Sequence, residues 1–171
     1  MNKAEYSKRA IIEALLQLLK TENYHDLTIQ RIVDEAQVSR MAFYRNFGTK
    51  DAIMKLHLDR VTDDFMARTH MRFVEHEPYD YFQKLLGHLM EHREMGLALI
   101  RADLFDLMRA EFDRAFAIMN PPLDSVGRYR FHFIAGGMCN VYYQWLTGGC
   151  RESCEELTEI MVRALSAQKQ S

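Results

Sequence analysis

The sequence predicts an all-α protein, in which an N-terminal helix-turn-helix unit of three helices is followed by a larger helical domain. Three observations support this fold class. Apolar residues recur at the i, i+3, i+4, i+7 spacing of an amphipathic helix through most of the chain. The β-branched residues never alternate over the length of a strand. Two short helical segments, at about 28–36 and 39–47, are separated by only Gln37 and Val38, which is the plan of a helix-turn-helix.

The composition limits the class of protein. The chain has 171 residues, 48% of them hydrophobic, which suffices for one substantial core or two small subdomains. Its three cysteines do not make a disulfide framework. No apolar run reaches the roughly 18–20 residues of a membrane span, and the N-terminus lacks the apolar region of a signal peptide. We therefore expect a cytoplasmic protein that does not contact the membrane.

The charge is distributed unevenly along the chain. Residues 1–60 carry ten Lys/Arg against eight Asp/Glu, whereas residues 61–171 carry twelve against sixteen. The sign of this asymmetry favours an N-terminal part that binds anions.

Apolar spacing and capping residues predict the first four helices. The first covers about residues 3–22, and the fourth runs from Lys50 to about residue 74. The second and third are the short helices named above, and a glycine follows the third. The expected N-caps are Thr28, Ser39 and Thr49 before the second, third and fourth helices, and Gly48 is expected to end the third as its C′ residue.

Four more helices are expected downstream. The first has Pro78 in its first turn and is broken by Gly96. The second, "ADLFDLMRAEFDRAFAIM", is closed by Asn120-Pro121-Pro122. The third, at about 125–147, is apolar nearly all round, so we expect it to be buried on several sides before Gly148-Gly149 stop it. The last amphipathic helix is marked by Leu157, Ile160, Met161, Ala164 and Leu165.

The aromatic and basic residues of "VSRMAFYRNFGTKDAI" suit contact with DNA. In a helix-turn-helix, the second helix enters the major groove with its N-terminal end first. Arg40 at that end can bind a guanine edge with two hydrogen bonds, while Met41 and Ala42 can contact a thymine methyl. The alternative is an ordinary bundle with a solvated basic face, because the basic excess is small. Phosphate contacts are expected from Tyr44, Arg45 and Lys50, and inward packing from Phe43 and Phe47.

The segment "LTIQRIVDEAQVSRMAFYRNFGTKDAI" resembles the DNA-binding domain of TetR-family transcriptional repressors, and the resemblance covers about residues 5–60. Gln37 stands where the family often has glycine, and Ala42 where many members have threonine or serine. The C-terminal segment "FHFIAGGMCNVYYQWLTGGCRESCEELTEIM" is similar in style to the last helices of the DhaS-like branch. The residues that match the family pattern are Thr28, Ile32, Ala36, Val38, Ser39, Phe43, Tyr44, Phe47 and Lys50.

This resemblance implies a DNA-binding transcriptional regulator, and neither an enzyme nor a cofactor-dependent protein. We expect a homodimer that binds a palindromic operator in double-stranded DNA, and a repressor that responds to an unidentified small-molecule effector. The alternative is a DhaS-like co-regulator that acts through a protein partner without an operator of its own. The DNA-binding domain is expected at 1–48, extended by 49–60, and the effector-binding and dimerisation domain at 61–171. The expected DNA-contacting residues are Thr28, Gln30, Ser39, Arg40, Met41, Ala42, Tyr44, Arg45 and Lys50.

The larger domain is expected to hold the effector pocket and the dimer interface. Methionine and phenylalanine form adaptable apolar cavities, although such side chains more often fill ordinary cores. A glycine pair permits close helix approach and large amphipathic side chains suit an interface, unless they only fill the monomer core. The expected pocket residues are Phe65, Phe82, Leu86, Leu104, Phe105, Met108, Phe112 and Met138, with His88, His132, Tyr129 and Arg101 as polar candidates. The expected interface residues are Gly136, Gly137, Tyr142, Trp145, Leu157 and Met161.

Two further patterns suggest other chemistry. "HLMEH" places His88 and His92 on one face of a helix with Glu91 beside them, which is the spacing of metal ligands and of the inverzincin proteases. A protease is disfavoured because no sheet is evident, and the default expectation is two exposed histidines without a metal. Cys150 and Cys154 lie at a helix start, where the helix dipole favours a thiolate, so redox sensing stays open beside a plain capping role.

Overall fold

The computed structural model describes residues 3–69, 77–119 and 124–167. Across these ranges it contains nine α-helices and no strand, which confirms the all-α prediction, and none of these helices is long and apolar enough to cross a bilayer. The helices are α1 Lys3–Leu18, α2 Ile29–Glu35, α3 Arg40–Asn46, α4 Lys50–Thr69, α5 Pro78–Glu91, α6 Arg93–Arg101, α7 Phe105–Met119, α8 Ser125–Thr147 and α9 Cys154–Ala167. The expected continuation of α4 to residue 74, and the closure of α7 by residues 120–122, lie outside the described ranges.

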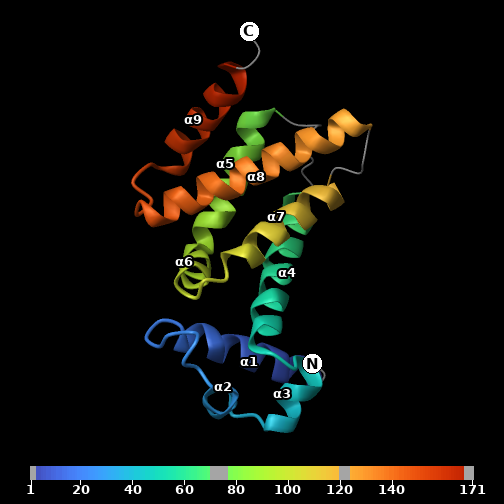
Figure 1. The fold of residues 1–171 in the computed structure, drawn as a ribbon, viewed down its shortest axis with the longest axis vertical. Coiled ribbons are helices and arrows are strands. Elements are labelled where there is room, and N and C mark those ends of the chain that lie inside the picture. Colours follow the sequence, from blue (N-terminus) through green and yellow to red (C-terminus); the bar gives the residue numbers. More distant parts are fainter. Residues whose placement is uncertain (1–2, 70–76, 120–123, 168–171) are drawn as a thin grey trace.

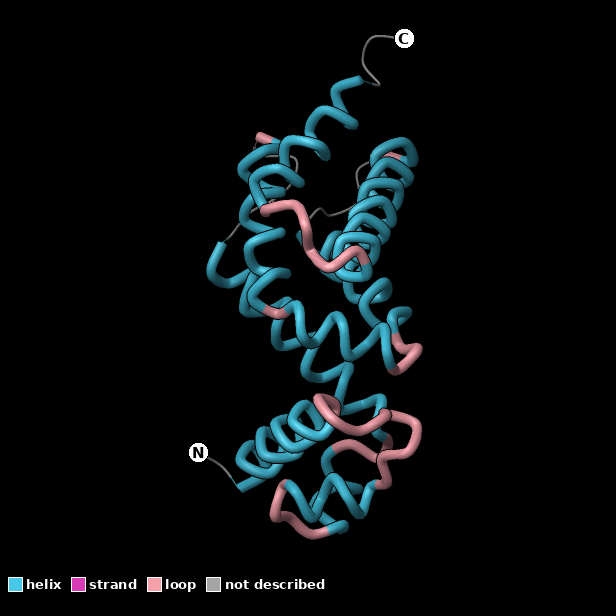
Figure 2. The backbone as a smooth tube through the Cα atoms, turned by 90° about the vertical axis from the view of Figure 1, so that its left-hand side faces the viewer, coloured by secondary structure: helices cyan, strands magenta, loops and turns pink. Residues whose placement is uncertain are grey.

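The helices form two groups that are joined by α4. Figure 1 shows α1, α2 and α3 at one end of an elongated molecule and α5 to α9 at the other. α4 starts in the first group, where it packs on α1, and rises into the second group, where it packs on α7. The view in Figure 2, turned by 90°, shows the same arrangement. A displacement of α4 is therefore felt in both groups.

Side-chain caps delimit the short helices of the N-terminal group, as the sequence predicts. The hydroxyls of Thr28 and Ser39 each accept a hydrogen bond from the amide three residues later, at 3.1 and 3.2 Å. Gln37, in the turn between α2 and α3, has a φ of 52°, and Gly48 after α3 has a φ of 78°. A left-handed conformation costs a non-glycine residue about 1–2 kcal/mol, which the packing of the two helices offsets at Gln37.

One continuous apolar core runs through both groups. Phe43 of α3 and Ile53 of α4 are buried in the N-terminal group, and Tyr81 of α5 and Tyr142 of α8 are buried in the larger group. In the larger group, α5 packs on α9, and α7 packs on α8 and α6. The buried stripes predicted from the apolar spacing are thus the surfaces along which these helices meet.

The prediction that Gly96 breaks a helix is wrong. α5 ends at Glu91, His92 separates it from α6, and Gly96 lies buried within α6. A Cβ atom on Gly96 would lie 2.6 Å from Cδ1 of Leu146 and 2.7 Å from the hydroxyl oxygen of Tyr142. Glycine is needed here because α8 approaches α6 closely, and not because the chain turns.

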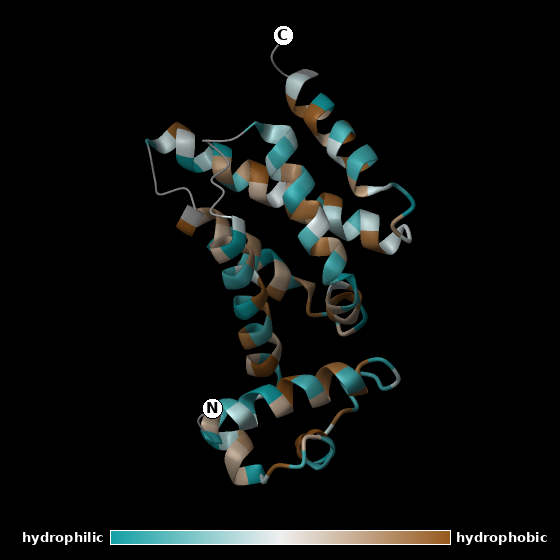
Figure 3. Cartoon of the chain, turned by 180° about the vertical axis from the view of Figure 1, so that it is seen from behind, coloured by the Kyte–Doolittle hydropathy of each residue, from teal (hydrophilic) through white to brown (hydrophobic). Residues whose placement is uncertain are grey.

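α8 is less buried than its composition predicts. Val126 is 74% exposed, Tyr129 68% and Phe133 65%, although the C-terminal half of the helix lies in the core. These three residues are spaced by three and four positions, so they share one face of the helix. Figure 3 shows hydrophobic segments among the hydrophilic ones along α8. A single copy of the chain therefore leaves an apolar stripe of α8 in water, and we call Val126, Tyr129 and Phe133 the α8 stripe.

Candidate nucleic-acid interface and effector cavity

α3 presents two arginines and two large side chains to solvent. Met41 is 79% exposed and Tyr44 52%, and Arg40 and Arg45 are exposed beside them. Within the described part of the chain neither arginine has an ion-pair partner, whereas Arg31 of α2 is held by two glutamates. Unpaired guanidinium groups on an exposed helix are available to phosphates and to guanine edges. Four of the residues expected at DNA, Arg40, Met41, Tyr44 and Arg45, are thus exposed on α3, and their contacts with DNA stay predictions.

The opposite face of α3 is buried and includes one residue that was expected to contact DNA. Phe43 is fully buried, and its ring centroid lies 6.2 Å from that of Phe47, so this pair holds α3 on the core as predicted. Ala42 is only 8% exposed. The prediction that Ala42 contacts a thymine methyl is wrong, because its own methyl group faces the core beside Phe43.

The side chain of Lys50 is also occupied within the protein. Its Nζ donates hydrogen bonds to the backbone oxygens of Tyr24 and Leu27, both at 2.7 Å, and lies 4.5 Å from the centroid of the Tyr24 ring. The Tyr24 hydroxyl in turn donates to the carboxylate of Asp51. Burial and this carboxylate raise the pKa of Tyr24, so the hydroxyl keeps its proton. The expected phosphate contact of the Lys50 side chain is wrong in this conformation; the ammonium holds the loop between α1 and α2.

Three more residues expected at DNA lie on the surface near α3. Thr28 and Ser39 use their hydroxyl oxygens as cap acceptors, which leaves each O–H able to donate outward. The Nε2 of Gln30 donates to the Asp34 carboxylate at 2.7 Å, and the side chain of Gln30 is exposed. Contacts of these residues with DNA stay predictions.

A small cavity lies between α4, α5, α7 and α8. Its volume is about 60 Å³. Of the expected pocket residues, Phe65, Met108 and Phe112 line it, and so does His88, one of the polar candidates. The other expected residues lie elsewhere: Phe82, Leu86 and Met138 are buried in the core, Leu104 and Phe105 are partly buried, Tyr129 and His132 are exposed, and Arg101 lines a different hollow beside the α1–α2 loop. Lining residues that the sequence did not predict for the pocket include Leu58, Tyr81, Leu85, His92, Glu111 and Tyr142.

Two histidines form the polar end of this cavity. The ring centroids of His88 and His92 are 4.8 Å apart, and the His88 ring lies 4.9 Å from that of Phe65 on α4. Both side chains are half-buried, so the default expectation of two exposed histidines is wrong. Burial, followed by the nearby His92, lowers the pKa of His88. On α4, burial, followed by the charges of His92 and Arg60, lowers the pKa of His57 to about 4. Both His57 and His88 are therefore neutral at pH 7.

The cysteines give no support for redox sensing. Burial is the main cause that raises the pKa of Cys150 and of Cys154, so the helix start does not favour their thiolates as expected. Cys139 is buried in α8, where burial raises its pKa to about 11, and it packs as a small apolar side chain.

A groove between α8 and α9 contains part of the expected dimer interface. Leu157 and Met161 line it, together with Val141 and the 53% exposed Ile160. Trp145 also lines the groove, although it is only 4% exposed and its Nε1 donates to the Glu152 carbonyl at 3.0 Å, so its role in an interface stays a prediction. Tyr142 does not line the groove: it is 1% exposed, and its hydroxyl donates to the Leu89 carbonyl at 3.1 Å. Tyr142 therefore belongs to the monomer core, and its assignment as a large interface anchor is wrong. Gly136 is partly exposed and Gly137 exposed on α8. The α8 stripe is not among the residues predicted for the interface, although its i, i+3, i+7 spacing is a usable signal.

Comparisons with known proteins agree with this geometry. The family model described as "Bacterial regulatory proteins, tetR family" matches residues 11–56, which run from α1 into α4. No curated protein sequence matches the chain. Among solved structures, Lin0861 from Listeria innocua has a TM-score of 0.77 at 11% identity, covering 98% of this chain and 95% of that one.

Two other solved structures extend the comparison. A TetR transcriptional regulator from Streptococcus agalactiae has a TM-score of 0.68 at 17% identity, covering 95% of this chain and 94% of that one. The dihydroxyacetone kinase operon activator DhaS has a TM-score of 0.59 at 17% identity, and 95% of each chain is covered. Identities this low establish a common fold across both groups of helices, while the family model concerns the helix-turn-helix.

Proposed function

We propose that this chain, which belongs to the TetR family of DNA-binding transcriptional regulators, acts as a homodimer on a palindromic operator and responds to a small ligand. The observation that carries the proposal is the exposed face of α3, where Arg40 and Arg45 are unpaired within the described part of the chain. Arg40 lies in the first turn of α3, the end that enters the major groove, so we assign base recognition to Arg40 and Met41. Tyr44 and Arg45 are assigned to phosphate contacts.

The proposed dimer forms through α8 and α9. The α8 stripe and Ile160 are large apolar side chains that one copy of the chain leaves exposed. Pairing of two copies through this face removes these side chains from water. The burial stabilises the dimer by roughly 25 cal/mol for each Å² of apolar surface covered. A two-fold axis through the pair then places two α3 helices on the same side of the duplex. Half-sites are expected as an inverted repeat, with centres one helical turn (roughly 34–36 Å) or slightly more apart.

The proposed ligand response passes through α4. This helix lines the cavity with Leu58 and Phe65 and begins at Lys50, which is tied to the α1–α2 loop. A ligand that fits the cavity of one conformer better than that of the other changes the spacing of the two α3 helices. To move the ratio of the two conformers from 1:99 to 99:1, the ligand must bind the favoured conformer more tightly by about 5.5 kcal/mol. We propose repression as the outcome, because a dimer seated on a promoter excludes other proteins from it.

Selection from a random duplex DNA library tests this function. The full-length protein is expected to enrich an inverted repeat whose half-sites are about one helical turn apart. The same selection with added competitor DNA at low and high salt separates specific binding from charge-driven binding. Enrichment of no sequence at either salt concentration would contradict the proposal. That result would instead favour a co-regulator that acts through a protein partner.

A further inference from the structure

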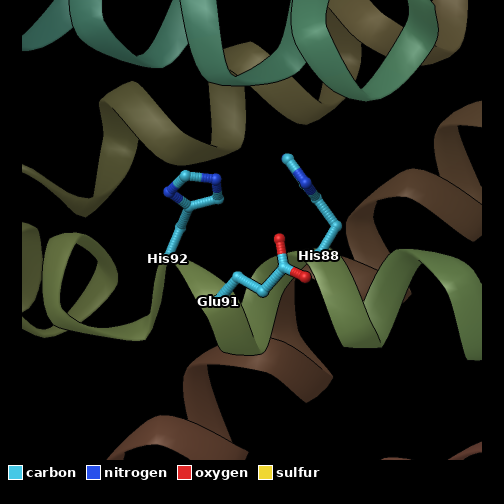
Figure 4. A group of neighbouring side chains, drawn as sticks. All are labelled: His88, Glu91 and His92. Atoms are coloured by element: carbon cyan, nitrogen blue, oxygen red, sulfur yellow. The ribbon is translucent and has the colours of Figure 1, made fainter. Parts of the chain in front are cut away.

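We infer that His88, Glu91 and His92 form a binding site for a divalent transition-metal ion at the polar end of the cavity, and that this ion is a ligand of the regulator. The second half of this inference rests on the proposed ligand response, whereas the first half does not. Figure 4 shows the three side chains on α5, with both imidazoles projecting to the same side of the helix and the Glu91 carboxylate between them.

The geometry of the three side chains is close to that of a metal site. Their possible ligand atoms all lie within 4.8 Å of one another. Two nitrogen ligands of a tetrahedral zinc ion lie roughly 3.3 Å apart, since each bond is about 2.0–2.1 Å long. The remaining gap is closed by small side-chain rotations, because the i, i+3 and i+4 positions of a helix lie on one face.

The Nε2 atom of His88 shows why an ion suits this position. It is buried and has no hydrogen-bond partner among the described residues. A buried polar group without a partner costs about 1–3 kcal/mol, so such an atom calls for a specific explanation. The neutral imidazole offers a lone pair toward an apolar enclosure lined by Phe65 and Leu89. A bound metal ion, with the water that it carries, would satisfy that lone pair.

The size of the cavity also favours an ion over an organic molecule. Its volume of about 60 Å³ holds an ion with one or two waters. Pockets for drug-sized ligands have roughly 300–1,000 Å³, so such a molecule would require the helices to move apart first. The wall is mostly apolar, and its polar side chains are the two histidines, Glu111, Thr62 and two tyrosines. A dry apolar shell around a few ligand atoms strengthens the interaction between an ion and its ligands.

The ligand types select the class of ion. Two imidazoles and one carboxylate suit zinc and its first-row neighbours such as cobalt and nickel, whereas magnesium and calcium prefer oxygen ligands throughout. The negative charge of Glu91 offsets part of the charge of the ion. Three protein ligands leave at least one position for water or for another side chain.

α4 packs against this site and leads to the DNA-binding end. The Phe65 ring of α4 lies 4.9 Å from the His88 ring, and Leu58 and Val61 of α4 line the same cavity. An ion held by α5 therefore lies beside α4, the helix that begins next to the α1–α2 loop. Ion binding is expected to change the position of α4 and hence the affinity for the operator.

Cobalt titration of the full-length protein tests the site itself. The probe is Co²⁺, whose visible absorption reports coordination by imidazole nitrogen, and Zn²⁺ is then added to displace it. Wild type is expected to bind one Co²⁺ per chain and to show the visible absorption band of the bound ion. His88→Gln and His92→Gln are expected to lose this band. The matched control His132→Gln alters an exposed histidine and should bind like wild type. Glu91→Gln, an isosteric change at an exposed side chain, should weaken binding by roughly 10-fold or more and leaves the fold intact.

Two results would overturn the site: no cobalt binding by wild type, or unchanged binding by His88→Gln, His92→Gln and Glu91→Gln. Circular dichroism of each variant shows that a lost band is not lost folding. The ligand role is tested separately by measuring the affinity for the selected operator with and without Zn²⁺. A change in that affinity is expected for wild type and for His132→Gln, but not for His92→Gln. If cobalt binds and the operator affinity stays constant, the ligand role is overturned; if no operator is selected, the proposed function fails while the metal site stands.

Discussion

A single ammonium group sets how the helix-turn-helix joins the rest of the protein. Lys50 Nζ binds two backbone carbonyls of the α1–α2 loop, and the neighbouring Asp51 accepts a hydrogen bond from Tyr24 of the same loop. Both residues belong to the first turn of α4. The two contacts therefore fix the start of α4 against the N-terminal group, which a rigid relay between cavity and DNA requires.

Replacement of Lys50 by methionine is expected to lower the free energy of unfolding by about 1.5–3 kcal/mol. The reason is the loss of two charge-assisted hydrogen bonds, which leaves two carbonyls without their donor. Chemical denaturation of both proteins measures the difference. Lys55→Met, on the exposed side of α4 in an i, i+4 pair with Asp59, is the matched control and should cost under about 0.5 kcal/mol. Equal losses in the two variants would show that Lys50 is only a surface charge.

Local rules predict the residues of α2 and α3 well, but not all of their contacts. The caps Thr28 and Ser39 and the inward pair Phe43 and Phe47 follow from spacing and side-chain chemistry alone. The burial of Ala42 was missed because a small residue in the first turn of a helix gives no signal about which neighbour covers it. In the same way, the family motif cannot show which group the ammonium of Lys50 contacts.

At the scale of elements, an ion-pair network connects α4 to α7. Arg114 of α7 donates to Glu111 at 2.9 Å and to Asp63 of α4 at 3.0 Å, and lies 3.8 Å from Asp59. Glu111 is only 6% exposed and lines the cavity. The network therefore couples a cavity wall to the helix that leads to the DNA-binding end.

Arg114→Met is expected to destabilise the protein by about 2–4 kcal/mol, because it leaves the buried Glu111 carboxylate without a counter-charge. The double variant Glu111→Gln, Arg114→Met removes that charge as well and should recover more than half of the loss. Thermal or chemical unfolding of the wild type, the two single variants Glu111→Gln and Arg114→Met, and the double variant forms a double-mutant cycle. Additive losses would mean that the pair is not coupled.

The cavity was only partly predictable from the sequence. Apolar periodicity identifies the buried faces of α4, α5, α7 and α8, which is why Phe65, Met108 and Phe112 were found. It cannot identify where those faces leave a gap, because that depends on how the helices cross. For the same reason the partial burial of His88 and His92 could not be predicted. The sequence shows their spacing along the helix, but not which neighbouring helices cover them.

At the scale of the whole molecule, the uncovered apolar surface lies on the helices proposed to pair. The α8 stripe and Ile160 stay exposed in one copy of the chain. Large apolar side chains that cluster on one face indicate an interaction site rather than ordinary surface. In the proposed dimer, a second copy would cover this face and would supply the second α3 helix that a palindrome requires.

Phe133→Glu is expected to convert the dimer into monomers and to weaken operator binding by at least about 10-fold. A glutamate in the paired face places an unpaired charge in an apolar interface, whereas the 65% exposed side chain contributes little to the monomer fold. Analytical ultracentrifugation measures the mass. Tyr6→Glu, which changes another exposed aromatic residue on α1, should remain dimeric. A wild-type protein that sediments as a monomer at all concentrations would contradict the proposed assembly.

The central claim is that the N-terminal end of α3 reads the base sequence. Fluorescence anisotropy with the selected operator and with a scrambled duplex tests it most directly, using wild type, Arg40→Ala and the exposed control Arg109→Ala on α7. Loss of a bidentate guanine contact costs about 1–3 kcal/mol, which is roughly 5- to 150-fold in Kd. We expect Arg40→Ala to lose this affinity for the operator while Arg109→Ala binds like wild type. If Arg40→Ala still prefers the operator over the scrambled duplex as strongly as wild type does, then α3 does not read the sequence in this way.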